Sequence, residues 1–148
     1  IAYARDVAGG VEVDALMVDI RTRDEYTGAT APYSYIPTSG RIPGAVWGKA
    51  GTGTSGMEDY LNADGTLAPE KVYPYWNSIG LTTDKHLSFY CGTAWRSSLA
   101  WFYGYMMGYE NISNFDSSWF EWSMGDGSDY AGADPVLNPI VDDEPSLP

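Results

Sequence analysis

A short apolar run leads into a helical pattern near the middle of the chain. Residues 87–90 read Leu-Ser-Phe-Tyr, which has the length and composition of a buried strand, and side chains from Ser97 to Met107 recur at helical spacing. The small-residue turn Cys91 to Ala94 separates them. A strand that turns directly into a helix is typical of α/β domains, because the helix returns over the sheet that the strand belongs to.

The rest of the chain repeats this alternation. Short strands are predicted at 15–20, 45–47 and 111–115, a helix from Pro69 to about 79, and an aromatic turn and helix start at 116–122. This order favours an α/β domain with a central, mostly parallel sheet flanked by helices.

Chain length and composition fit one such domain. The 148 residues are 44% hydrophobic, which is enough for one core, and we assign residues 1–125 to it. Residues 126–148 are rich in Asp, Gly and Pro and are predicted to be an acidic tail or linker. The chain begins at Ile1 without a methionine, so a trimmed start is expected, and a bacterial origin with a cytoplasmic or exported location stays open.

The net charge of -12 argues against nucleic acid and anionic membranes as partners. No apolar run reaches the roughly 20 residues of a membrane span. A single cysteine excludes an internal disulfide. Neither a cofactor nor a metal is expected, since the acidic turn at 126–129 lacks the ligand spacing of a calcium loop.

That single cysteine, Cys91, lies where a loop opens into a helix. Free backbone N–H groups and the helix dipole at such a place favour a thiolate and attract anions. Gly92 lets the backbone approach an anion closely, and Arg96 adds a permanent positive charge. The alternative interpretation is that Cys91 is a small buried apolar residue with no catalytic role. The neighbouring residues favour a nucleophile.

Four separated motifs resemble the rhodanese family. The segment 18–28 contains Asp-x-Arg followed by Glu-aromatic-x-Gly, and 40–45 reads Gly-Arg-Ile-Pro-Gly-Ala, with Arg41 where the family usually has His. Residues 91–96 resemble the six-residue active-site loop, and 116–122 resembles an Asp-Gly-Gly-Trp-x-Glu-Trp block. Together with an insertion at 33–36, these motifs are most similar to the catalytic C-terminal half of a tandem rhodanese, so a second rhodanese domain is a candidate partner.

The resemblance implies a sulfurtransferase. The Cys91 thiolate would take the outer sulfur of an anionic donor such as thiosulfate, release sulfite, hold a persulfide and pass the sulfur to a thiol or cyanide. No general base is needed, and His86 is predicted to lie on the surface. The implied substrate-binding residues are Gly92, Thr93, Ala94, Trp95, Arg96 and Arg21.

Two departures bear on the donor. The loop has Thr93 and Ala94 where thiosulfate enzymes carry basic residues, and it resembles the mercaptopyruvate branch instead. That branch has an arginine where this chain has Glu25, whose carboxylate is expected to repel mercaptopyruvate. Trp95 either gates the pocket or fills the core. Arg21 either supports an anion or pairs with Asp19 to fix a loop.

Two other functions remain open. A phosphatase or arsenate reductase of the same fold also combines a cysteine, a loop of amides and an arginine, but such enzymes resemble Cys-x5-Arg, whereas Cys91 and Arg96 are separated by four residues. A non-enzymatic persulfide carrier or regulatory module would use Cys91 with little turnover.

Overall fold

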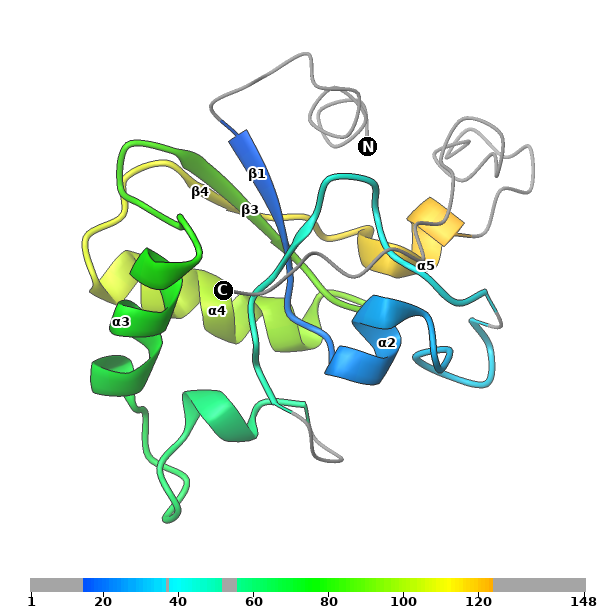
Figure 1. Ribbon diagram of the computed structural model, residues 1–148, viewed down its shortest axis with the longest axis horizontal. Helices are drawn as coiled ribbons and strands as arrows, with labels where there is room; N and C mark the ends of the chain where they lie inside the picture. Colours follow the sequence, from blue (N-terminus) through cyan, green and yellow to red (C-terminus); the bar gives the residue numbers. More distant parts are fainter. Residues whose placement is uncertain (1–14, 37, 52–55, 124–148) are drawn as a thin grey trace.

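The computed structural model describes residues 15–36, 38–51 and 56–123. Its centre is a four-stranded sheet in the order β2-β1-β3-β4, with every neighbouring pair parallel (Figure 1). The strands are β1 (Ala15–Asp19), β2 (Val46–Trp47), β3 (His86–Tyr90) and β4 (Ile112–Asn114). The predicted α/β architecture with a parallel sheet is confirmed.

Helices lie between the strands and after the last one. They are α2 (Arg23–Thr27), the 3-10 helix η1 (Glu58–Tyr60), α3 (Pro69–Ser78), α4 (Trp95–Met106) and α5 (Ser118–Ser123). Pro69 begins α3, where its missing N–H costs nothing, as its position in the sequence predicts.

The short helix α2 is absent from the sequence-based expectation, although its ends carry clear signals. The Thr22 hydroxyl accepts from the Glu25 amide while the Glu25 carboxylate accepts from the Thr22 amide, which is a capping box. Gly28 ends the helix in the left-handed conformation, with φ of 83°. This capping box also places the Glu25 side chain beside the end of β1.

The sheet separates two hydrophobic cores, because alternate strand residues point to opposite faces. Val18 and Phe89 belong to the core under α3 and α4, together with Trp76 and Tyr103. The residues of the other core come from β1, β3 and α5, from the segment 36–45 and from the position just after β4. They are Met17, Ile36, Ile42, Ala45, Tyr90, Phe115, Trp119 and Trp122. Figure 1 shows α3 and α4 on one side of the sheet and α5 on the other.

Some sequence expectations differ from the structure. The helical spacing over 97–107 predicts one helix face against the sheet. In α4, Ala100 and Tyr103 are buried, whereas Phe102 and Met106 are exposed. His86, expected on the surface, is half-buried, with its Nε2 3.0 Å from the Ser113 hydroxyl. The predicted tail 126–148 lies outside the described residues. No helix within the described ranges is long and apolar enough to cross a membrane.

Candidate active site

Cys91 follows the last residue of β3 directly, and α4 begins four residues later at Trp95. The residue before the helix, Ala94, has a φ of 66°, which turns the loop sharply into α4. In an open parallel sheet, the carboxyl ends of the strands are where ligands bind. The strand-to-helix junction therefore places the only thiol of the chain at the edge expected for a binding site, although its side chain is fully buried.

The loop after Cys91 is held from one side by α5. The amide of Trp119 donates to the Cys91 carbonyl at 3.0 Å, and that of Phe120 donates to the Gly92 carbonyl at 2.9 Å. The Cys91 amide itself donates to the Ser118 hydroxyl at 3.2 Å. These contacts fix the loop and leave the N–H groups that follow Cys91 unpaired.

Within the described part of the chain, the amides of residues 92–96 have no hydrogen-bond acceptor from the protein. Four of these five N–H groups belong to the loop and the first residue of α4, where the positive end of the helix dipole also lies. Such a row of unpaired donors can hold an anion without reorganisation. The unpaired amides can therefore stabilise a negative charge that forms next to Cys91.

Arg96 at the start of α4 is paired with Glu25 from α2. Its two terminal nitrogens each donate to a different carboxylate oxygen at 2.7 Å, and both side chains are largely buried. Burial alone would lower the pKa of Arg96, but the hydrogen bonds and charge of Glu25 raise it above the ordinary value. Glu25 is therefore paired and not a free carboxylate, and its expected repulsion of mercaptopyruvate stays a prediction that the opposite charge of Arg96 weakens.

A hollow of about 310 Å³ lies beside this ion pair. Its lining residues are Thr22, Glu25, Thr30, Ala31, Pro32, Tyr33 and Arg96. Tyr33 also covers the loop, since a Cβ at Gly92 would lie 2.5 Å from the Tyr33 ring. The Nε of Arg96 is buried and has no partner among the described residues. The hollow, Tyr33 and the Cys91 loop are therefore contiguous.

Arg21 lies in the core and not at this hollow. Its Nε and one terminal nitrogen donate to the two Asp19 oxygens at 2.9 and 2.6 Å, and the same terminal nitrogen donates to the Gly40 carbonyl at 2.7 Å. The guanidinium lies 4.9 Å from the centre of the Trp119 ring and has no solvent exposure. The structure therefore fits the interpretation of Arg21 as a structural pair and gives it no access to a dissolved anion.

The other loop residues differ in exposure. Thr93 is half-buried and Ala94 is buried, whereas Trp95 is 83% exposed. Trp95 therefore does not fill the core, and a gating role for it stays a prediction.

Two residues near the loop were missed by sequence reasoning. Tyr33 and Ser118 are far from Cys91 in the chain, and only the folded sheet brings them to it. Ser118 has a φ of 50°, and its hydroxyl bridges the Cys91 amide and the Phe115 carbonyl. A local signal for Ser118 is the family block at 116–122, where the position is usually Gly. No cluster of three metal-ligating side chains occurs in the described ranges.

The fold and the site together define an α/β domain with a cysteine at the mouth of an amide-lined loop. The chain belongs to the rhodanese-like domain family, whose model matches residues 4–124.

Two sequence relatives are similar to most of this chain. The chain is 42% identical over 111 residues to thiosulfate sulfurtransferase YnjE of Escherichia coli, which covers 74% of this chain and 26% of YnjE. It is 34% identical over 135 residues to the sulfur carrier protein TtuD of Thermus thermophilus, covering 82% of this chain and 44% of TtuD. The chain thus spans between a quarter and a half of the length of these relatives.

Similar solved structures include an EanB variant and an anaerobic ergothioneine biosynthesis enzyme. A variant of EanB with a cysteine persulfide, in a tetrahedral intermediate state with ergothioneine, superposes with a TM-score of 0.83 at 36% identity, covering 98% of this chain and 32% of that one. The anaerobic ergothioneine biosynthesis enzyme from Chlorobium limicola, in complex with trimethyl histidine, has a TM-score of 0.77 at 40% identity, covering 83% and 29%.

Proposed function

We propose that this domain is a sulfurtransferase that carries sulfur as a persulfide on Cys91. The thiolate attacks the outer sulfur of a donor such as thiosulfate, the S–S bond of the donor breaks, and sulfite leaves with the electron pair. A thiolate or cyanide acceptor then attacks the terminal sulfur of the persulfide and releases the Cys91 thiolate. Neither step needs a general base when donor and acceptor react as anions.

The observation that carries this proposal is the row of unpaired amides at residues 92–96 next to Cys91. Both the leaving sulfite and the persulfide are anions, and preorganised backbone donors stabilise them at little reorganisation cost. The similarity to a named thiosulfate sulfurtransferase and to a persulfide-bearing EanB variant supports the same chemistry. Gly92, Thr93, Ala94, Trp95 and Arg96 are proposed to surround the transferred sulfur.

A second candidate is a persulfide carrier that receives sulfur from a dedicated protein. The pairing of Arg96 with Glu25 favours it, because that pairing removes the side-chain charge that would capture a small anionic donor. The similarity to the sulfur carrier TtuD supports it as well. The same pairing disfavours a phosphatase, since an arginine that is already bonded to a carboxylate is less available to a phosphoryl group.

The test is thiocyanate formation from thiosulfate and cyanide, by the chain and by Cys91→Ala. Turnover that depends on Cys91 supports the enzyme. A stoichiometric persulfide without turnover supports the carrier. Trimethyl histidine and a small thiol replace cyanide in parallel reactions that are followed by sulfite release, because one solved relative is in complex with trimethyl histidine. Absence of turnover with every acceptor, together with absence of a persulfide, would contradict both.

A further inference from the structure

The helix α4 presents a row of large apolar side chains to solvent. Trp101, Phe102, Tyr105 and Met106 expose between 36% and 65% of their surfaces. Together with Ser98 they follow the spacing i, i+3, i+4, i+7 and i+8, which places all five on one side of a helix. We call these five residues the α4 outer face.

The opposite side of α4 packs on the sheet. Ala100, Tyr103 and Gly104 are buried there, and a Cβ at Gly104 would lie 3.2 Å from the side chain of Ile112 on β4. The attachment of α4 to the domain therefore does not use the α4 outer face, which keeps its large side chains on the side away from the sheet.

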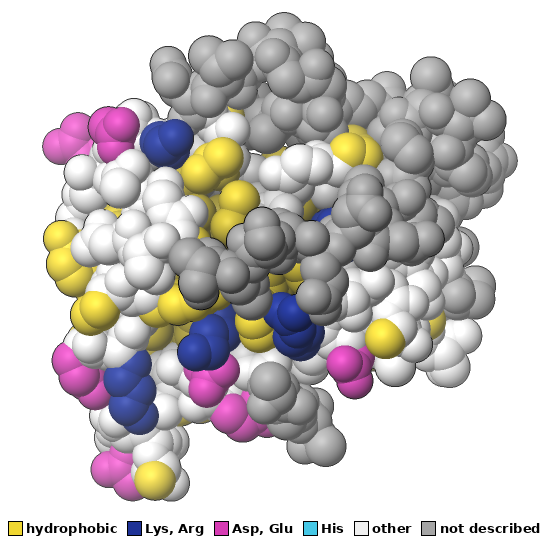
Figure 2. Space-filling view, in the orientation of Figure 1, with side chains coloured by type: hydrophobic (Ala, Val, Ile, Leu, Met, Phe, Trp, Pro, Cys, Tyr) yellow, Lys and Arg dark blue, Asp and Glu magenta, His cyan; other side chains and the backbone are white. Residues whose placement is uncertain are grey.

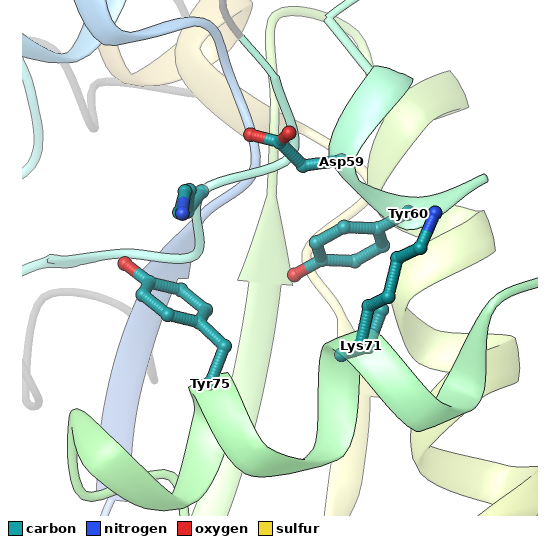
Figure 3. A pocket seen from close by; sticks show the side chains of 6 residues that line it. Asp59, Tyr60, Lys71 and Tyr75 are labelled. Carbon is teal, nitrogen blue, oxygen red and sulfur yellow. The ribbon is translucent and has the colours of Figure 1, made fainter. Parts of the chain in front are cut away.

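The α4 outer face is not interrupted by charge. Residues 97–109 contain no Asp, Glu, Lys or Arg, although 19% of the chain is charged. Figure 2 shows charged side chains scattered among apolar ones on one face of the molecule, and in Figure 3 Asp59 and Lys71 lie at a hollow beside α3. A surface helix usually carries such charges on its solvent side, so their absence from α4 is typical of a surface that another molecule covers.

The α4 outer face can lose its water at little cost. The Ser98 hydroxyl donates to the Trp95 carbonyl at 2.7 Å, so its burial leaves no unpaired donor. The rings of Trp101 and Tyr105 are stacked, with their centres 5.8 Å apart and their planes 12° from parallel. This stacking holds both side chains in place before binding, which reduces the conformational entropy lost on association.

The size of the α4 outer face fits a small homodimer interface. With roughly 200 Å² for each large side chain, the exposed fractions correspond to about 370 Å² of mainly apolar surface. An interface at the lower end of the stable range buries about 600 Å² on each copy, of which about 65%, or roughly 390 Å², is apolar. Two α4 outer faces therefore supply the apolar part of such an interface.

The charge of the chain limits what can cover this surface. A basic partner would be attracted by the carboxylates that give the chain its net charge of -12, and it would find no opposite charge on the α4 outer face. A second copy presents the same uncharged surface, so contact between the two faces buries no charge. The dipoles of the two helices favour an antiparallel arrangement.

We propose that two copies of this chain associate through their α4 outer faces as a weak, symmetric dimer. Apolar contact holds the two copies together against the repulsion between two acidic chains. The contact does not involve Cys91, so the proposal does not depend on the proposed function.

The test is sedimentation equilibrium of the whole chain over a wide range of concentrations, with a reductant present so that no disulfide forms through Cys91. We expect the average mass to rise from one chain toward two, with half of the chains paired at roughly 10–100 μM, because the interface is small. Added salt should strengthen the association, since it screens the repulsion between the acidic chains and leaves the apolar contact intact.

Matched variants connect the association to α4. Tyr105→Glu places a carboxylate on the α4 outer face and should weaken the association at least tenfold. Tyr73→Glu makes the same change at a 47% exposed tyrosine of α3 and should leave the association unchanged. Circular dichroism checks that both variants fold.

Three results of these experiments would overturn the proposal: a chain that stays monomeric at every concentration, equal association of the two variants, or an association that salt weakens. Binding of the monomeric chain to phosphatidylcholine vesicles would also overturn it, because the α4 outer face would then be a membrane contact.

Discussion

The carboxylate of Glu25 and the guanidinium of Arg96 form two parallel hydrogen bonds of 2.7 Å across the mouth of the candidate active site. The residues are 71 positions apart in the chain and come from α2 and α4. Because the pair is internally neutral, the backbone amides of residues 92–96 are the main source of positive potential beside Cys91.

Removal of the Glu25 charge should strengthen the capture of an anionic donor. In Glu25→Gln the Arg96 charge is no longer cancelled, and about 1 kcal/mol of added attraction would lower the KM for thiosulfate about fivefold. Steady-state thiocyanate assays at several thiosulfate concentrations measure this. Glu70→Gln, an exposed substitution on α3, is the control and should leave KM unchanged. An increased KM in Glu25→Gln would contradict the account.

The same pair should make stability depend on pH in the acid range. Burial alone would raise the pKa of Glu25. The hydrogen bonds and charge of Arg96, together with the hydrogen bonds of Thr22, lower this pKa below its usual range. A carboxyl group with a lowered folded-state pKa stabilises the fold above its unfolded pKa and loses this contribution as the pH falls through the folded value. At neutral pH we expect the free energy of unfolding of Glu25→Gln to be about 2 kcal/mol lower than that of the wild type.

Urea unfolding of wild type and Glu25→Gln at a series of pH values measures this difference. It should shrink as the pH falls below the usual carboxyl range. A difference that stays constant into acid would mean that the Glu25 charge does not stabilise the fold.

Gly92 and Tyr33 should be coupled. A methyl group at Gly92 would lie 2.5 Å from the Tyr33 ring, so Gly92→Ala must displace the ring or the loop. We expect turnover to fall at least tenfold, which corresponds to about 1.4 kcal/mol. The double variant Gly92→Ala with Tyr33→Ala should recover part of the loss. Equal activities of the single and double variants would show that the ring is not the obstacle.

Replacement of two tryptophans near the loop should affect the stability of the domain very differently. Trp95 is 83% exposed, so Trp95→Ala should change the free energy of unfolding by less than about 0.5 kcal/mol. Trp119 is fully buried beneath the Arg21 guanidinium, and Trp119→Ala should cost about 3–5 kcal/mol. Thermal and urea unfolding of Trp95→Ala and Trp119→Ala measure the two effects. A large loss for Trp95→Ala would show that its side chain packs against the domain.

The sequence predicts the elements well where periodicity is strong. The expected strand at 15–20 is β1, and the expected helix from Pro69 to about 79 is α3, each within one residue or so at the ends. The short helix α2 was missed, because five residues carry no periodicity and only the Thr22 and Glu25 capping box marks it. Short elements are recognised by their caps and not by hydrophobic spacing.

Only those parts of the site that depend on neighbouring residues in the sequence were predicted. The position of Cys91 between strand and helix follows from the residues around it. The pairing of Glu25 with Arg96 does not, since it joins residues of two elements whose relative placement depends on the whole sheet. The exposure of Trp95 likewise follows from the orientation of α4, which is set by small residues such as Ala100 against the sheet.

The most direct test of the central proposal is the intact mass of the chain after incubation with thiosulfate and removal of the excess donor, compared with Cys91→Ser. The account predicts one added sulfur atom in the wild-type chain, lost again when cyanide is added, and no added sulfur in Cys91→Ser. An unchanged mass of the wild-type chain with thiosulfate and with a protein persulfide donor, or an added sulfur that persists in Cys91→Ser, would contradict it.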